Sequence, residues 1–157
     1  MQAKSLLRHP QAVSKLSECV GGGFQCVLPD PAAGRQIKRL LLCSGKVYYE
    51  LCAHRQERHR EDVAIVRLEQ LYPLSAEALE AALPQVQAGT RAFWVQEEPE
   101  NMGAWRFVHE RLGATLHANL PLRAVCRPES ASPATGSAGA HRLEQQHLIE
   151  RAFSEEA

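Results

Sequence analysis

The densest group of residues that could do chemistry is a short acidic stretch behind an aromatic run. Phe93 and Trp94 are bulky residues typical of buried strands, and Glu97, Glu98 and Glu100 come directly after them. Paired carboxylates can perform general acid–base catalysis when an apolar pocket raises the pKa of one of them. The same residues also fit a solvated acidic turn or an acidic contact with another domain, and the sequence leaves all three interpretations open.

A second candidate site lies at residues 43–46, where a strand pattern passes into a helix pattern. Ser44, a glycine and Lys46 offer a hydroxyl, free backbone N–H groups and a cation, which together can hold a phosphate or a carboxylate. The segment is not a Walker A sequence, and it also fits a tight turn with Lys46 in water. Lys4 and Arg8 bracket two leucines near the N-terminus, which fits either a solvated arm or an anion site shared with another domain.

Cysteine and histidine form no array of known chemistry. The five cysteines include no C-x-x-C pair, and their odd number in a chain of this size predicts reduced thiols in a cytosolic-type compartment. The seven histidines form no H-E-x-x-H or Cys/His ligand pattern, so we expect no metal site. A Cys–His nucleophile pair would meet in space rather than in sequence, and no local motif supports such a hydrolase.

Strand and helix patterns alternate from residue 36 onward, and they must position these groups. Apolar runs predict strands at residues 39–43, 63–68, 93–95 and 122–126. Helical spacing follows each run: from Val47, from Ser75 to Val86, from Trp105 to Leu116, and before the C-terminus. This alternation predicts a three-layer α/β/α fold with a mostly parallel sheet. The acidic turn then lies at the carboxyl end of a strand, where ligands and neighbouring domains are met.

Residues 1–35 are expected to form an arm, and residues 36–157 to form one domain. A short helical pattern through Leu16 and Val20 ends at three glycines, and an edge strand is expected between Phe24 and Leu28. The loop that follows is inferred from its proline and glycine content alone.

Composition excludes several classes of function. Eighteen basic residues balance eighteen acidic ones, so the chain has no broad electrostatic footprint for nucleic acid or an anionic membrane. No apolar run approaches the roughly 20 residues of a membrane span. The apolar part of the first seven residues is too short for a signal peptide.

Five segments of the chain resemble one family, in the right order and across essentially all 157 residues. They are residues 4–10, 43–49, 62–73, 96–105 and 127–136. Together they resemble the C-terminal part of the thiamine-diphosphate-dependent decarboxylating component of the 2-oxoglutarate dehydrogenase complex. The run Glu-Glu-Pro-Glu-Asn-Met-Gly-Ala-Trp resembles the form of this segment in bacterial members of the family.

The resemblance implies a transketolase-type C-terminal domain, with one antiparallel edge strand and an arm that leads from a missing pyrimidine-binding domain. It also implies that thiamine diphosphate, magnesium and the catalytic histidines belong upstream, so this chain alone is expected to hold no cofactor and no activity. The whole enzyme would be a bacterial cytoplasmic homodimer. It would decarboxylate 2-oxoglutarate oxidatively in the citric acid cycle and pass the succinyl group to the lipoyl-bearing succinyltransferase core. This chain would complete and buttress that assembly.

Two groups of site residues follow from this reading. Some relatives in the family are regulated by nucleotides or acyl-coenzyme A at their C-terminal region, and the candidates for such an anion site are Lys4, Arg8, Ser44 and Lys46. The candidates for an interdomain contact are Glu97, Glu98 and Glu100. The alternative, from a different class, is a free-standing α/β module that binds an anionic metabolite or nucleotide through the turn at residues 44–46.

Overall fold

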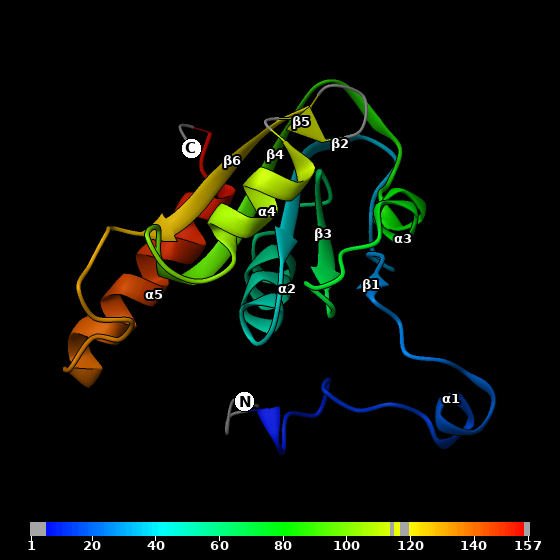
Figure 1. Cartoon of the computed structure of the whole chain (residues 1–157), viewed down its shortest axis with the longest axis horizontal. Helices are drawn as coiled ribbons and strands as arrows, with labels where there is room; N and C mark the ends of the chain where they lie inside the picture. Colours follow the sequence, from blue (N-terminus) through cyan, green and yellow to red (C-terminus); the bar gives the residue numbers. More distant parts are fainter. Residues whose placement is uncertain (1–5, 114, 117–119, 156–157) are drawn as a thin grey trace.

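The computed structural model describes residues 6–113, 115–116 and 120–155. Within them the chain forms a six-stranded sheet in the order β1-β3-β2-β4-β6-β5 (Figure 1). The parallel strands are β2 (Ile37–Cys43), β3 (Val63–Leu68), β4 (Val86–Pro99) and β6 (Leu120–Arg127). The edge strands β1 (Val27–Leu28) and β5 (Thr115–Leu116) run antiparallel to their neighbours. The mostly parallel sheet is confirmed, but an antiparallel strand lies at each edge rather than at one.

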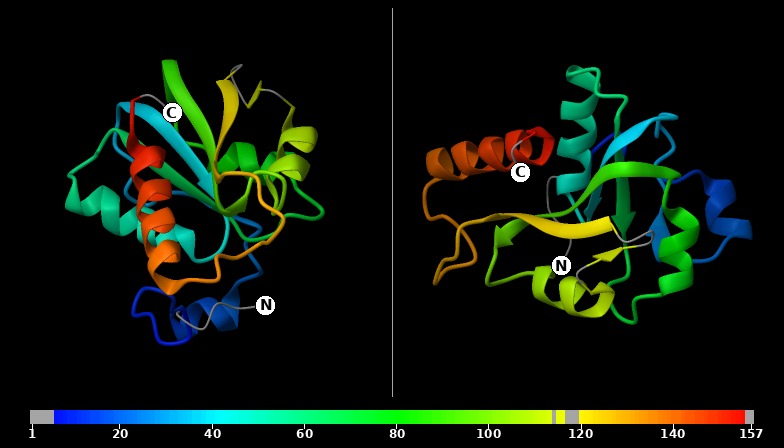
Figure 2. Two further views of the ribbon diagram at one scale, coloured as in Figure 1. Left: turned by 90° about the vertical axis from the view of Figure 1, so that its left-hand side faces the viewer. Right: turned by 90° about the horizontal axis from the view of Figure 1, so that it is seen from above.

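Helices cover both faces of this sheet, as a three-layer fold requires. The helices α2 (Val47–Glu57) and α5 (Ala138–Phe153) lie on one face, and α3 (Ala76–Ala82) and α4 (Trp105–Leu112) lie on the other, which the right-hand view of Figure 2 shows. No helix in the described ranges is long and apolar enough to cross a membrane.

Successive residues of the central strands feed two separate cores, because side chains alternate between the faces of a strand. Leu41 and Phe93 pack with α2 and α5, whereas Leu40 and Trp94 pack with α3 and α4. All four are at most 1% exposed. A strand buried on both faces reads as a continuous apolar run, which is why the strand positions could be predicted.

Two predicted helix ends are wrong, and local chemistry explains both. Helix α3 ends at Ala82 because Leu83 precedes a proline and takes the extended conformation, so Val86 is the first residue of β4 rather than part of a helix. Helix α4 ends at Leu112 because Gly113 has a φ of 76°, so Leu116 lies in β5.

A buried arginine fastens the end of α5 to the sheet. Arg39 is 2% exposed, donates to the carbonyl of Ala152 at 3.1 Å, and stacks on Phe93 with its guanidinium carbon 4.4 Å from the ring centre. Burial, with help from the neighbouring Arg91, lowers the pKa of Arg39 to about 10. Carbonyls at a helix C-terminus lack helical partners, so the Arg39 guanidinium completes the last turn.

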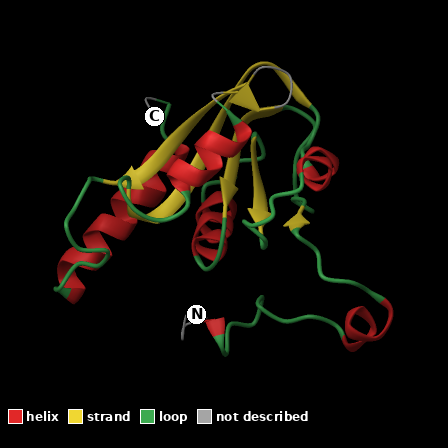
Figure 3. Cartoon of the chain, in the orientation of Figure 1, coloured by secondary structure: helices red, strands yellow, loops and turns green. Residues whose placement is uncertain are grey.

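The chain before β1 is organised differently from the rest. We call residues 6–26 the outer arm, and the described residues from 27 onward the body. The outer arm is mostly loop, with a short helical segment at residue 6 and the six-residue helix α1 (Leu16–Gly21), which has no buried residue (Figure 3). It passes beneath the carboxyl ends of β2 and β3 in Figure 1. The expected edge strand is only the two residues of β1.

Candidate functional site

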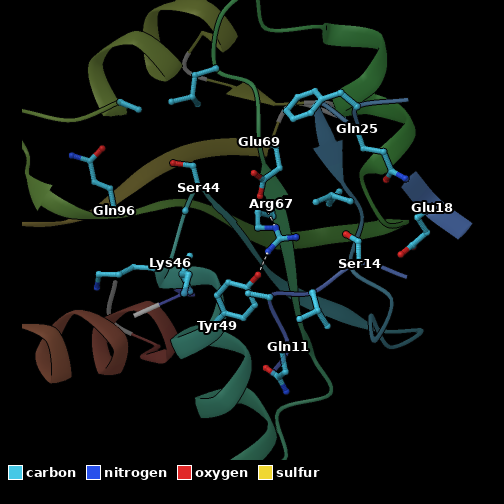
Figure 4. A pocket seen from close by; sticks show the side chains of 18 of the residues that line it. Gln11, Ser14, Glu18, Gln25, Ser44, Lys46, Tyr49, Arg67, Glu69 and Gln96 are labelled. Atoms are coloured by element: carbon cyan, nitrogen blue, oxygen red, sulfur yellow. Dashed lines mark hydrogen bonds and ion pairs between the residues drawn. The ribbon is translucent and has the colours of Figure 1, made fainter. Parts of the chain in front are cut away.

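A groove of about 2250 Å³ lies between the outer arm and the carboxyl ends of the parallel strands. The body lines it with residues from the turn after β2, from the ends of β3 and β4, and from the first turn of α2 (Figure 4). The body side chains used below are Ser44, Lys46, Tyr49, Arg67, Glu69, Gln96 and Glu97. Carboxyl ends of neighbouring strands meet at one edge, which is why segments far apart in sequence converge here.

Lys46 and Glu97 join two parts of the groove that the sequence could not connect. Lys46 follows β2, whereas Glu97 lies near the end of the neighbouring strand β4, and their side chains form an ion pair. Lys46 also contacts Glu50 on the next turn of α2, with Nζ 3.4 Å from a carboxylate oxygen. The lysine is only 28% exposed, so an incoming anion would have to compete with two carboxylates for it.

The first turn of α2 leaves backbone donors free of side-chain caps. Gly45 has a φ of 69°, a conformation that suits glycine and lets the chain turn sharply out of β2. Lys46 occupies the N-cap position without making a side-chain cap hydrogen bond. Uncapped N–H groups at a helix N-terminus attract anions, and Ser44 stands beside them with its hydroxyl.

Arg67 is the second cation of the groove. Its side chain donates to the Tyr49 hydroxyl at 2.9 Å and forms an ion pair with Glu69 at 2.9 Å. Its guanidinium carbon also lies 4.4 Å from the ring centre of Tyr48. Burial raises the pKa of the Tyr48 hydroxyl, so that ring stays neutral beneath the cation. These contacts hold Arg67 in one orientation facing the groove (Figure 4).

The acidic turn is held rigid by one buried amide. Gln96, which is 4% exposed, accepts from the indole N–H of Trp94 at 2.9 Å and from the backbone N–H of Trp105 at 2.8 Å. Its amide nitrogen donates to the carbonyls of Pro99 at 3.1 Å and Met102 at 2.7 Å. The turn between β4 and α4 is therefore closed around a side chain with a complete set of partners.

The loop after β6 is tied to that turn. Asn101 donates to the carbonyl of Ser130 at 2.9 Å and accepts from the Ser130 backbone N–H at 3.1 Å. At the start of the loop, Arg127 pairs with Glu144 of α5 at 3.2 Å. The loop thus packs against its neighbours at these points rather than acting as a free linker.

The three carboxylates of the acidic turn occupy different environments. Glu97 pairs with Lys46, whereas Glu98 and Glu100 are exposed. Acid–base catalysis by a carboxylate pair needs one member in an apolar pocket, and none of the three has such a setting. The geometry leaves two of them available for a contact with another surface.

The anion candidates nominated from the sequence are not all brought together. Ser44 and Lys46 line the groove, but Arg8 is exposed and does not line it, and Lys4 lies outside the described residues. The arm reaches the body through His9, whose ring lies 4.7 Å from that of Tyr49.

Cysteine chemistry has no support in this geometry. All five cysteines are free. Burial raises the pKa of Cys43, and it raises the pKa of Cys126 to about 12, so both thiols are protonated near neutral pH. A protonated, buried thiol is a poor nucleophile. In the described part of the chain, no group of three or more His, Cys, Asp or Glu residues is placed to hold a metal ion.

Comparison with known proteins decides the family. A family model described as 2-oxoglutarate dehydrogenase C-terminal matches residues 13–153. The chain belongs to this family. The 2-oxoglutarate dehydrogenase E1 component of Cupriavidus necator is 43% identical over 98% of the chain. Those of Haemophilus influenzae and Azotobacter vinelandii are 43% and 44% identical, each over 96% of the chain.

The chain spans only 16% of the length of each of these three relatives. The match to a C-terminal family model shows which part it is. The groove of this 2-oxoglutarate dehydrogenase C-terminal domain therefore corresponds to one region of much longer relatives.

Sequence reasoning missed two residues that shape the site of this C-terminal domain. The apolar pattern predicts Arg67 only as part of a strand, although a cation inside the run Val-Ala-Ile-Val-Arg-Leu signals that this side chain has a specific partner. Gln96 stood beside the acidic residues and gave no such signal, because its role depends on backbone groups that only the folded turn brings near.

Proposed function

We propose that the chain is the C-terminal assembly domain of a bacterial 2-oxoglutarate dehydrogenase E1 component. The observation that carries the proposal is identity of 43–44% with proteins of that name over nearly the whole chain. The complete enzyme would decarboxylate 2-oxoglutarate oxidatively, pass the succinyl group to the lipoyl-bearing succinyltransferase core, and work as a homodimer in the cytoplasm.

The cofactor of that enzyme belongs to its upstream domains. Thiamine diphosphate supplies a carbanion-stabilising centre for decarboxylation, and it needs protein ligands for its diphosphate and magnesium. In the described ranges of this chain no group of three or more His, Cys, Asp or Glu residues is placed to hold a metal ion, and two of the groove carboxylates, Glu97 and Glu69, are paired with Lys46 and Arg67. The role left to these residues is to shape and support a neighbouring surface.

The acidic turn is the part of the domain best built to meet the upstream domains. Gln96 holds its backbone in place, and the side chains of Glu98 and Glu100 are exposed. A rigid turn loses little conformational freedom on docking, so its charges can select the orientation of a partner. Glu97 contributes indirectly by holding Lys46.

Substitution of Glu98 separates this role from a structural one. Glu98→Gln should change the unfolding free energy of the chain by less than about 0.5 kcal/mol, since the side chain is exposed. In the complete enzyme it should weaken assembly, measured as the dimer fraction by analytical ultracentrifugation. Unfolding of the chain by Glu98→Gln would contradict an interdomain role, because the turn would then be an internal network.

Activity measurements test the proposal as a whole. With thiamine diphosphate and magnesium, this chain alone should release no carbon dioxide from 2-oxoglutarate, and the polypeptide extended upstream to the length of its relatives should release it. Carbon dioxide release by the chain alone would contradict the assignment, and so would an inactive extended polypeptide that binds the cofactor.

An anionic effector is the second candidate function, and the uncapped start of α2 beside Ser44 and Arg67 is the observation that favours it. Lys46 would have to exchange Glu97 for the ligand. Each lost charge-assisted contact should weaken binding by roughly 1.5–3 kcal/mol, or about ten- to a hundredfold.

Calorimetric titration of adenosine monophosphate and acetyl-coenzyme A tests the effector site. Lys46→Ala should weaken binding and Arg8→Ala serves as its comparison, because Arg8 does not line the groove. Binding by this chain alone would favour the free-standing module, and binding only by the complete enzyme would favour a regulated dehydrogenase. No binding to either would remove the site.

A further inference from the structure

The outer arm exposes an unusual amount of apolar surface. Leu16 and Val20 are 80% and 82% exposed, and four residues apart on α1 they lie on one face of the helix. Val13 and Phe24 flank that helix at 75% and 72% exposed. Single exposed apolar residues are ordinary, but four of them within twelve positions, on one segment, mark an interaction surface.

The helix at the centre of this surface has nothing in the body to hold it. Helix α1 has six residues and none is buried, and Figures 1 and 2 place it at the margin of the molecule. Isolated helices shorter than about 12 residues are marginal in water, and most helices in proteins are held by packing of an apolar face. The arm therefore has the form of a segment that needs a second surface to cover it.

The groove behind the arm also exceeds what a metabolite requires. Its volume is about 2250 Å³, whereas pockets for small molecules are usually about 300–1,000 Å³. Val13 and Phe24 line it from the arm, and Leu71 and Phe107 line it from the body. An apolar lining on both walls suits an inserted polypeptide segment.

The length of the relatives indicates which polypeptide that is. The chain corresponds to 16% of their length and matches a C-terminal family model, so most of their sequence precedes this region. The arm is the first part of the chain and hence the part nearest to those residues. A tethered neighbour reaches an effective concentration of about millimolar, so docking needs no high intrinsic affinity.

We propose that the outer arm and its groove form the docking surface for the part of the enzyme that precedes this region, with Val13, Leu16, Val20 and Phe24 as its apolar contacts. The proposal rests on the proposed function, and it adds a location: the upstream domain enters the groove beside Val13 and Phe24, and it also covers Leu16 and Val20, which lie on α1 outside the groove lining.

Cys19 provides a native probe of this surface. It is exposed, it lies in α1, and it lines the groove. Alkylation of Cys19 by iodoacetamide, followed by mass spectrometry, should be at least about tenfold slower in the upstream-extended polypeptide than in this chain alone, since protection follows coverage. Cys43, which is buried, should react slowly in both and reports any unfolding.

A matched pair of variants assigns the effect to the arm. Val20→Asp should restore fast alkylation of Cys19 in the extended polypeptide and leave the melting temperature of this chain unchanged. Leu143→Asp is the control, because Leu143 is 63% exposed on α5, away from the arm. It should not change the rate of Cys19 alkylation in the extended polypeptide or in this chain.

The possible outcomes separate this inference from the proposed function. Equal alkylation rates in both proteins, or no effect of Val20→Asp, would overturn the docking surface even if the extended polypeptide decarboxylates 2-oxoglutarate. Slow alkylation in a polypeptide without that activity would keep the surface and remove the function. The alkylation rate of Cys19 in this chain could also fall with rising protein concentration while the mass in solution doubles. That result would assign the surface to a second copy of the chain and overturn the proposal.

Discussion

The body and the outer arm differ in how their large apolar side chains are covered. In the body, Leu40, Leu41 and Trp94 are completely buried between two layers of helices. In the arm, Leu16 and Val20 are at least 80% exposed, and α1 makes no buried contact. The body therefore contains what it needs to fold, whereas α1 has no buried face to fix its position.

Charged residues show the same division. In the body, Arg39 donates to a carbonyl at the end of α5, and Arg55 pairs with the buried Asp30. In the arm, Lys15 is exposed, and its backbone N–H bonds to Glu18 within the same segment at 2.6 Å. Long-range polar contacts stabilise the body, whereas this contact of the arm is local and does not tie α1 to the body.

The largest effect should come from emptying the body core. Trp94 is 0% exposed, so Trp94→Ala should lower the unfolding free energy by about 3–5 kcal/mol. The matched substitution in the arm, Leu16→Ala, should change it by less than about 0.5 kcal/mol, because the side chain is already in water. Urea unfolding of the two variants measures the contrast, and a similar loss in both would contradict the division.

The next effect concerns the loop between β1 and β2. Asp30 has a side chain that is 1% exposed, and it pairs with Arg55 and accepts from the Ile65 backbone N–H at 2.7 Å. Asp30→Ala should cost about 2–4 kcal/mol, somewhat less than for a fully buried pair, because 12% of the Arg55 side chain stays exposed.

Two further variants control this prediction: one removes the arginine partner of Asp30, and the other breaks a weaker, exposed ion pair. Arg55→Met keeps the packing of the stem and should cost a similar amount, since it leaves Asp30 buried with two backbone donors. Arg106→Met breaks an exposed pair with Glu129 and should cost less than about 1 kcal/mol. Equal losses in Arg55→Met and Arg106→Met would show that Asp30 does not anchor the loop.

A smaller loss is expected at the support of the acidic turn. Gln96→Leu keeps the side-chain volume but leaves the Trp94 indole N–H and the Trp105 backbone N–H without their acceptor. The cost should be about 1–3 kcal/mol, and hydrogen exchange should quicken at residues 97–104 before the rest of the body. Gln96→Glu retains the acceptor and should lose less of the Trp105 protection, so a reversed order would contradict this role for the amide.

The smallest effect is a dependence on acid. Arg60 donates to both oxygens of Asp62, at 2.7 and 2.9 Å, and these hydrogen bonds hold the pKa of Asp62 below its ordinary value. A depressed carboxyl pKa stabilises the fold above the unfolded value of about 3.9, and that contribution is lost as the pH falls through the folded pKa. Both side chains are nearly a third exposed, which limits it to about 0.2–1 kcal/mol.

Comparison of the wild-type chain with Asp62→Asn isolates this contribution. The wild-type chain should be the more stable at pH 7, and the difference should shrink as the pH falls through the folded pKa of Asp62. A difference that persists at low pH would show that the substitution acts through packing rather than through the ion pair.

Residue periodicity was sufficient to predict the layers of the body but not its ends. Strands such as β2 and β3 are buried on both faces, so each left a continuous apolar run in the sequence. The ends of α3 and α4 depended on single residues, the proline after Leu83 and Gly113, whose effect on backbone angles outweighs the apolar spacing around them.

The candidate site was predictable only in part, because it is assembled from pairs distant in sequence. The turn at Ser44 and Lys46 could be placed at the end of a strand, and the acidic turn likewise. That Lys46 would meet Glu97 follows only from β2 and β4 being neighbours, which the order of elements along the chain does not specify. The exposure of the arm was equally invisible, since Leu16 and Val20 have the spacing of an ordinary buried helix face.

Native-state hydrogen exchange of this chain and of the upstream-extended polypeptide tests the division between body and arm most directly. In this chain, amides of β2, β3 and β4 should exchange only at the rate set by global unfolding, and amides at residues 13–24 should exchange nearly as fast as in an unstructured peptide. In the extended polypeptide, residues 13–24 should become protected while the core strands stay as they are. Protection of residues 13–24 in this chain alone, at concentrations where it is monomeric, would contradict the account.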